Sequence, residues 1–148
     1  MRTARILSAS TAALSFASPG VAQSVESPAW DTLAAITVEE IITDTSYEAR
    51  KTYPSEIEGG VAEFDITGFA VPLGGSENVR EFMIVSDMGF CPFCGDPEHA
   101  TALQVTLTEP IPFVEDGMRL SLRGALEPIK DPQTFQSVIL RDAVVIEG

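Results

Sequence analysis

Residues 61–67 have the sequence Val-Ala-Glu-Phe-Asp-Ile-Thr, which alternates apolar and polar side chains from Ala62 to Ile66. In an extended chain this two-residue period places the apolar side chains on one face and the polar ones on the other. It is typical of a β-strand with one buried face. The strand continues over residues 68–73, with a bulge predicted at Gly68. This pattern decides the fold class, because it recurs along the chain.

Several further runs are rich in β-branched and apolar residues and are bounded by glycine, proline or aspartate. The predicted strands are an edge strand over 36–45, then 81–86, 101–108, 118–123 and 137–147. Pro110 and Pro112 are predicted to stop the third of these runs, and the last has a break near Asp142. The polar stretch 46–58 is predicted to be a connection.

Five to six short strands without helical periodicity between them predict an all-β domain. The length and strand count favour a small, partly open barrel of the OB type, and a β-sandwich is the second interpretation. One short N-terminal helix is predicted over Pro28–Ala35, with Ser27 as its cap. Trp30 is expected to dock this helix on the barrel, and a ligand-stacking role for it is the alternative.

The first 22 residues have the organisation of a secretory leader. Arg2 and Arg5 precede a short apolar run over residues 6–16, and Gly20-Val-Ala22 has the small-x-small pattern of a cleavage site. We predict cleavage after Ala22 and a single mature domain of residues 23–148 in a bacterial periplasm. No membrane insertion is expected after cleavage, because the apolar run is too short to span a bilayer.

The chain has 22 Asp and Glu against 9 Lys and Arg, a formal net charge of −13 at pH 7. Such a charge repels phosphate backbones and anionic headgroups, so nucleic acid is not an expected partner. Metal cations or basic protein surfaces suit the charge better. The alternative is that the acidity serves solubility alone.

Both cysteines of the chain, Cys91 and Cys94, and its one histidine, His99, lie within a proline- and glycine-rich loop. Two thiolates at Cys-x-x-Cys spacing form half of a tetrahedral zinc site. His99 can turn back as a third ligand, and Asp96 offers a carboxylate oxygen. Sulfur together with imidazole selects zinc or copper over calcium or magnesium, and zinc is the predicted cofactor.

Two other interpretations of the cysteine pair stay open. An exported protein meets oxidising conditions, in which Cys91 and Cys94 would form a disulfide that stiffens the loop. The Cys-Pro-Phe-Cys sequence is also close to the redox motif of glutaredoxin-like proteins. That chemistry needs a helix N-terminus at the first cysteine, whereas Gly95-Asp-Pro97 follows here, and neighbouring carboxylates raise a thiol pKa. Covalent haem would need histidine where Gly95 stands, and motifs of hydrolases, phosphate loops and zinc proteases are missing.

The order of these segments resembles a bacterial domain-of-unknown-function family of small exported proteins. The resemblance covers nearly the whole mature chain and rests on residues 30–33, 60–73, 81–85, 91–99, 103–107, 120–126 and 140–145. It implies a small β-barrel with a cysteine- and proline-rich loop, an accessory role for metal-handling ABC transport systems, and no enzymatic activity. Many relatives carry Cys-x-His with a longer proline run in this loop, and only Cys91 matches that pattern directly.

The predicted function is a soluble periplasmic accessory protein that binds a zinc-like ion through Cys91, Cys94, His99 and Asp96. Its expected partner is a membrane transporter or another periplasmic protein. A metal-free protein-interaction module with a structural disulfide is the first alternative. A thiol–disulfide oxidoreductase is the second.

Overall fold

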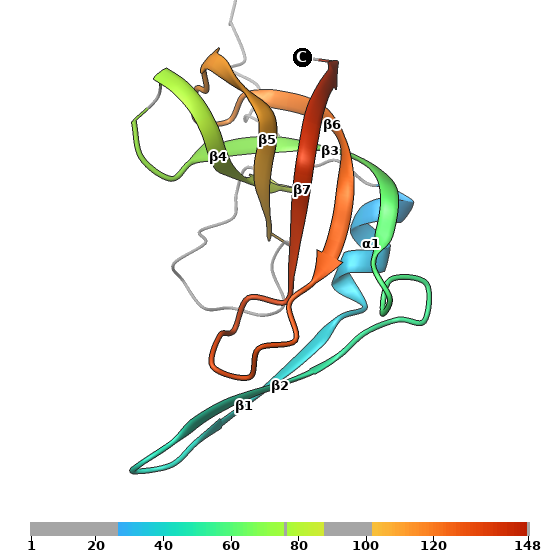
Figure 1. Ribbon diagram of the computed structural model, residues 1–148, viewed down its shortest axis with the longest axis vertical. Coiled ribbons are helices and arrows are strands. Elements are labelled where there is room, and N and C mark those ends of the chain that lie inside the picture. The colour runs from blue at the N-terminus through green and yellow to red at the C-terminus, as the bar shows by residue number, and fades with distance from the viewer. Residues whose placement is uncertain (1–26, 76, 88–101, 148) are drawn as a thin grey trace, which may run out of the picture.

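The computed structural model describes residues 27–75, 77–87 and 102–147, which form one helix and seven strands (Figure 1). They are α1 (Pro28–Ala34), β1 (Thr37–Ile42), β2 (Tyr47–Thr52), β3 (Val61–Pro72), β4 (Glu77–Val85), β5 (Ala102–Phe113), β6 (Arg119–Pro128) and β7 (Val138–Glu147). Five of the strands close into a barrel in the order β3–β4–β5–β7–β6. Strands β1 and β2 form a separate sheet.

The strand order and directions are those of an OB-like barrel. Strand β3 pairs antiparallel with β4 and β6, β4 with β5, and β6 with β7, while β5 and β7 are parallel. Counted within the barrel, the order is first, second, third, fifth and fourth, which is the Greek-key order of the OB-fold. The predicted all-β, OB-like fold is confirmed.

The barrel interior is filled by the inward-facing positions of its strands. Burial of each large aliphatic or aromatic side chain contributes about 1.5–3 kcal/mol. In β3, Ile66 is buried and Phe64 packs against the core, as the alternation predicted, whereas Ala62 is exposed where the pairing with β6 shifts. The side chains that are at most 2% exposed include Phe82, Ile84, Leu103, Val105, Leu107, Leu120, Leu122, Leu126 and Leu140.

Gly68 allows close packing against β3, and the bulge predicted there is wrong. Strands β3 and β6 pair without interruption from Phe64 to Phe69, and the shift in register lies upstream, between Val61 and Phe64. A Cβ added to Gly68 would lie 2.8 Å from the ring of Trp30 and 2.8 Å from the carbonyl oxygen of Val85. The glycine therefore lets the helix and the neighbouring strand approach.

Helix α1 lies against β3 and is held there by Trp30. The Ser27 side chain caps it by accepting a hydrogen bond from the Trp30 amide at 3.5 Å. The Trp30 side chain is buried, and its Nε1 donates to the carbonyl of Thr67 at 2.7 Å. The predicted helix and the docking role of Trp30 are confirmed, and the helix ends at Ala34 rather than Ala35.

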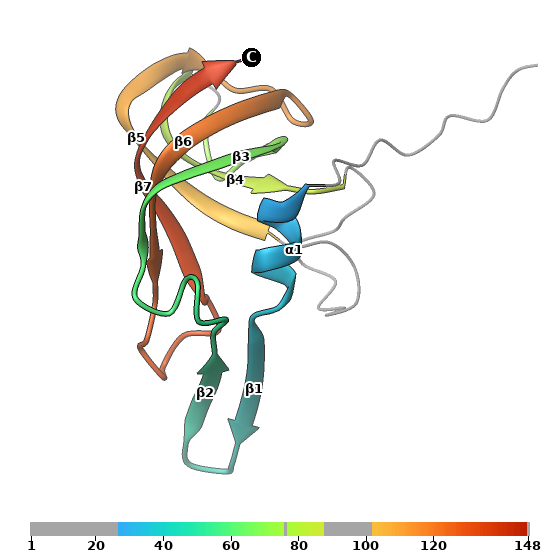
Figure 2. The same ribbon diagram turned by 90° about the vertical axis from the view of Figure 1, so that its right-hand side faces the viewer.

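Strands β1 and β2 form a hairpin that projects from one end of the barrel, and we call residues 37–52 the arm (Figures 1 and 2). The edge strand predicted over 36–45 corresponds to β1. The connection predicted over 46–58 is wrong, because Tyr47–Thr52 form β2. Most side chains of this ribbon are exposed, so its sequence lacks the apolar period that marks a half-buried strand.

Strand β5 runs through both prolines to Phe113, which corrects the predicted stop at Pro110. It pairs with β7 only over Gln104–Leu107, and beyond that it has β4 as its strand partner. A proline cannot donate to a ladder, and it is tolerated where one edge of the strand is free. Strand β7 runs without a break from Val138 to Glu147, so the break predicted near Asp142 is instead a bulge, where Asp142 has a φ of 49° and the pairing shifts.

Within the described residues, no helix has the length and apolar character needed to cross a bilayer. The predicted leader, residues 1–22, lies outside them.

Candidate functional site

The predicted metal ligands all lie outside the described residues. They are Cys91, Cys94, Asp96 and His99. They belong to the connection between β4 and β5, which begins and ends beside the paired residues Val85 and Ala102. Among residues 27–75, 77–87 and 102–147, no group of three or more His, Cys, Asp or Glu is placed to hold a metal ion. The zinc site stays a prediction.

Five exposed apolar side chains belong to strand ends away from this connection, at the end of the barrel where Glu77 of β4 pairs with Phe113 of β5. The end of β7 lies at this same end of the barrel (Figures 1 and 2). We call the five exposed side chains there the apolar rim. They are Leu73 (55% exposed), Phe113 (50%), Val144 (47%), Val145 (37%) and Ile146 (49%).

A shallow hollow of about 350 Å³ lies beside Leu73 and is lined by residues 73–75 and 77–81. It belongs to the β3–β4 connection, which is one of the loops that frame the ligand site of OB-folds. Asn78 has a φ of 52°, so the backbone turns sharply at the hollow. Small-molecule sites bury most of their ligand, whereas this hollow is open. It therefore suits a side chain of a docked polypeptide better than a cofactor.

Strands β5 and β7 pair with each other over only part of their length. The parallel pairing ends where Leu107 faces Ala143. Beyond it, β5 continues beside β4 to Phe113 and β7 continues beside β6 to Glu147. The bulge at Asp142 lies where the two strands separate. In the part of the chain that the structure describes, residues 144–147 thus have a strand on one edge only.

Carboxylates dominate the charge around the apolar rim. The segments 77–81 and 109–119, which contain the paired residues Glu77 and Phe113, carry five exposed acidic side chains and two exposed guanidinium groups, those of Arg80 and Arg119. The carboxylates are Glu77, Glu81, Glu109, Glu115 and Asp116. None of these seven groups forms an ion pair with another described residue, and the ion pairs of the described chain involve Arg50, Arg123 and Arg141 instead. This end of the barrel is therefore negative.

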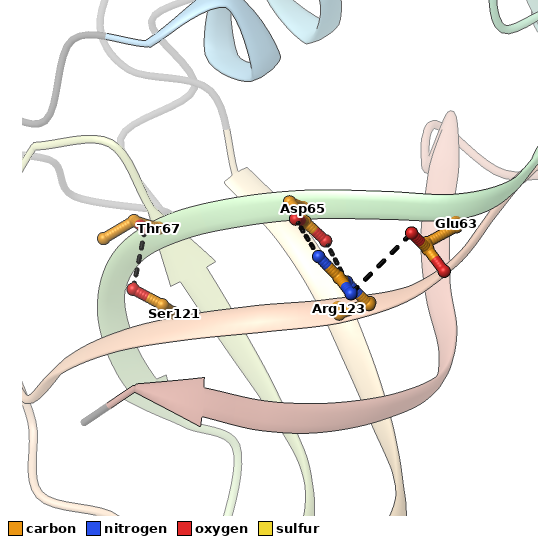
Figure 3. A network of polar contacts seen from close by, with 5 residues as sticks. All are labelled: Glu63, Asp65, Thr67, Ser121 and Arg123. Atoms are coloured by element: carbon orange, nitrogen blue, oxygen red, sulfur yellow. Dashed lines mark hydrogen bonds and ion pairs between the residues drawn. The ribbon is translucent and has the colours of Figure 1, made fainter.

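A polar cluster on β3 and β6 is satisfied within itself (Figure 3). Arg123 donates from Nε and Nη2 to the two oxygens of Asp65 at 2.6 Å each, and its Nη1 lies 3.7 Å from Glu63. The hydrogen bond from Arg123 lowers the pKa of Asp65. The hydroxyls of Thr67 and Ser121 lie 2.8 Å apart. Because these groups bind one another, the cluster holds two strands together rather than offering a ligand site.

Lys51 joins the arm to the loop between β6 and β7, residues 129–137. Its Nζ donates to the carbonyl oxygens of Ile129 (2.8 Å), Asp131 (2.8 Å) and Gln136 (2.7 Å). Partial burial lowers the pKa of Lys51, and the charge of Asp131 acts in the opposite direction. All three ammonium protons have acceptors. The adjoining hollow of about 200 Å³ is therefore part of the attachment between the arm and the loop 129–137.

Comparison of this chain with family models, with curated proteins and with solved structures found no match. The class of protein is defined by strand order: an OB-like β-barrel with a projecting arm. The resemblance to a domain-of-unknown-function family stays a prediction.

The apolar rim was not predicted from the sequence. Residues 143–146, Ala-Val-Val-Ile, form a continuous apolar run, which is typical of a strand buried on both faces. In the structure Val144 faces the exposed Arg123, and Val144, Val145 and Ile146 are exposed in the part of β7 that lies beyond its pairing with β5. The one sequence signal was the pair Pro110 and Pro112 in the strand opposite, which marks a free edge.

Proposed function

We propose that this chain is an exported, non-enzymatic binding module that docks another protein on its apolar rim. The observation that carries the proposal is the position of exposed apolar side chains. Of the seven large apolar side chains that are exposed in the described residues, five belong to the rim. Clustered exposed apolar side chains mark binding sites, whereas isolated ones are ordinary.

Oligonucleotides are common ligands of OB-folds, but this surface does not favour them. The OB-fold binds oligonucleotides on the face of its second and third strands, here β4 and β5. Glu81 and Met83 of β4 face Thr106 and Gln104 of β5 on the outside of the barrel. Single-stranded nucleic acid needs cations along the backbone and aromatic rings for stacking. These four side chains supply neither, so the proposed partner is a protein.

Site-specific photo-crosslinking in the native cell envelope tests the proposal. The crosslinking amino acid replaces Phe113 or Val145 in the rim, or Ile42 in the arm as a control that is 72% exposed. We expect a product of one defined mass from both rim positions, and its loss when untagged wild-type protein competes. No product from the rim positions, or the same products from all three positions, would contradict the proposal.

Zinc handling by the Cys91–His99 loop is a separate hypothesis that rests on sequence alone. Elemental analysis of untagged mature protein tests it, with Cys91→Ser combined with Cys94→Ser as the matched variant. The hypothesis expects bound zinc in the wild type and none in the variant. A mass lower by the two hydrogens of a disulfide, with no metal, supports the interaction module with a stiffened loop instead. Reduction of a test disulfide by the wild type alone supports the oxidoreductase.

A further inference from the structure

Within residues 27–75, 77–87 and 102–147, no strand pairs with one edge of β7 beyond Ala143. We propose that β7 binds an extended segment of a basic partner protein as an added β-strand along residues 144–147. This inference rests on the proposed function and gives it a mode of binding and a class of partner. In strand addition, main-chain hydrogen bonds supply affinity, and alternate side chains supply specificity.

Beyond the bulge at Asp142, β7 has a described strand on one edge only. Strand β6 occupies one edge of this segment, with Leu122 facing Val145 and Arg123 facing Val144. Backbone groups of a strand alternate between its two edges, so about half of those in residues 144–147 point away from β6. No described strand pairs with that edge. Val144, Val145 and Ile146 are β-branched residues that favour an extended backbone.

The neighbouring ends of β4 and β5 differ from the end of β7 in the residues that block their edges. Natural proteins block free edges with proline, charge or irregular backbone. Strand β5 has Pro110 and Pro112 in the part that pairs with β4 but no longer with β7, and the start of β4 has Glu77 and the positive φ of Asn78. Residues 144–146 of β7 contain no proline, glycine or charged residue; Asp142 and Glu147 flank them, and the pairing with β6 shifts between Val145 and Glu147. Within the described residues, the free edge of these three residues is therefore blocked by neither a proline nor a charge of its own.

The charge of the chain indicates which kind of partner segment would bind along β7. Segments 77–81 and 109–119 carry five carboxylates and two arginines without an ion pair to another described residue, and the whole chain has a net charge of −13. Two copies of this chain would bring the same carboxylates together, which opposes self-association. A segment with lysine or arginine beside alternating apolar residues meets the opposite charge and fills the rim.

A synthetic peptide in which valine alternates with lysine is the probe, added to the full-length mature protein. Its matched controls are a peptide with glutamate in place of lysine and a valine–lysine peptide whose alternate backbone amides are N-methylated. The N-methylated peptide keeps the charge but cannot complete the ladder. We expect it to bind at least about tenfold more weakly than the parent peptide, and the acidic peptide to bind more weakly still. Amide exchange should slow in residues 144–147 and remain unchanged in β1.

Val144→Pro and Val145→Pro form a second test. Amides of neighbouring residues point to opposite edges, so one substitution removes a bond to β6 and the other removes only an outward donor. The variant that keeps the wild-type unfolding midpoint is expected to lose peptide binding. If that variant binds normally, or if N-methylation has no effect, strand addition is overturned. A dimer of the wild type that this same variant abolishes would overturn the basic partner in favour of a second copy.

Crosslinking of the proline variant distinguishes a failure of strand addition from a failure of docking on the rim. Crosslinks at Phe113 that persist in the well-folded proline variant would mean that the rim binds a protein without an added strand. Loss of the crosslinks in that variant, together with normal crosslinks for Ile42→Ser, supports both proposals. An absence of crosslinks in the wild type would remove the docking function itself.

Discussion

Replacing Lys51 by methionine should loosen the arm from the barrel. Methionine keeps an unbranched side chain of similar length but cannot donate a hydrogen bond. The carbonyl oxygens of Ile129, Asp131 and Gln136 would each lose the donor that now lies 2.7–2.8 Å away. An isolated two-stranded hairpin is marginally stable in water, so the arm depends on this attachment.

The size of the effect follows from the geometry of the joint. A buried hydrogen bond from a charged donor contributes about 1.5–3 kcal/mol. Lys51 is only partly buried and water can reach the carbonyls, so we assign about 1 kcal/mol to each of the three bonds. Ordering the lysine side chain costs about 1 kcal/mol of this. The expected loss is therefore about 2 kcal/mol.

Two measurements report this loss. Urea unfolding followed by the fluorescence of Trp30 should show a midpoint lower by about 1 M, for a slope of about 2 kcal/mol/M. If the arm detaches without unfolding the barrel, hydrogen exchange reports it locally. The Ala49 amide donates to the carbonyl of Pro132 at 2.7 Å, and its exchange should accelerate by about thirtyfold.

Lys130→Met is the matched control. Lys130 lines the same hollow as Lys51, but no hydrogen bond or ion pair joins its side chain to another described residue. We expect this variant to unfold at the wild-type urea concentration. If Lys51→Met changed neither the midpoint nor the Ala49 exchange more than Lys130→Met does, the carbonyl cluster would not be what holds the arm.

Three further predictions concern the barrel. Trp30→Phe removes the 2.7 Å bond to Thr67, and the unfolding free energy from circular dichroism should fall by about 1–2 kcal/mol; an unchanged value would mean that packing alone holds α1. Gly124→Ala places a Cβ 2.7 Å from the Arg141 carbonyl oxygen and should cost about 1–3 kcal/mol, whereas Gly74→Ala meets open space and should be neutral. Arg123 holds the pKa of Asp65 below its ordinary 3.8, so the stability difference between wild type and Asp65→Asn should persist above pH 3.8 and vanish as the pH falls through the lowered pKa. A difference that stays constant down to pH 2 would contradict the pairing.

The parts of the fold that could be predicted from sequence are those in which one face of an element meets the core. Phe64 and Ile66 in β3 and the buried positions of β5 and β6 give the two-residue period directly. Helix α1 was predictable because Ser27 and Pro28 are local signals that need no tertiary partner.

The wrong predictions concern segments whose structure depends on partners that are far away in the sequence. Strand β2 lies in an exposed ribbon, so no apolar period marks it, and its partners in the loop 129–137 are about 80 residues away. Pro110 and Pro112 appeared to end β5, because a single sequence does not tell whether a strand has neighbours on both edges. The apolar rim was missed because an unbroken apolar run does not tell which of its residues, such as Val144, face outward or lie beyond the end of a neighbouring strand's pairing.

The pairing of β3 with β6 also sets an order of events during synthesis. Contacts such as Asp65–Arg123 and Thr67–Ser121 join residues 58 and 54 positions apart. Contacts so distant in the chain form slowly, because a long loop must close first. A ribosome adds about 5–20 residues per second, so β3 leaves it seconds before β6 is complete at Pro128. Until then the apolar face of β3 has no barrel to enter, so the barrel closes only after β6 and β7 have been synthesised.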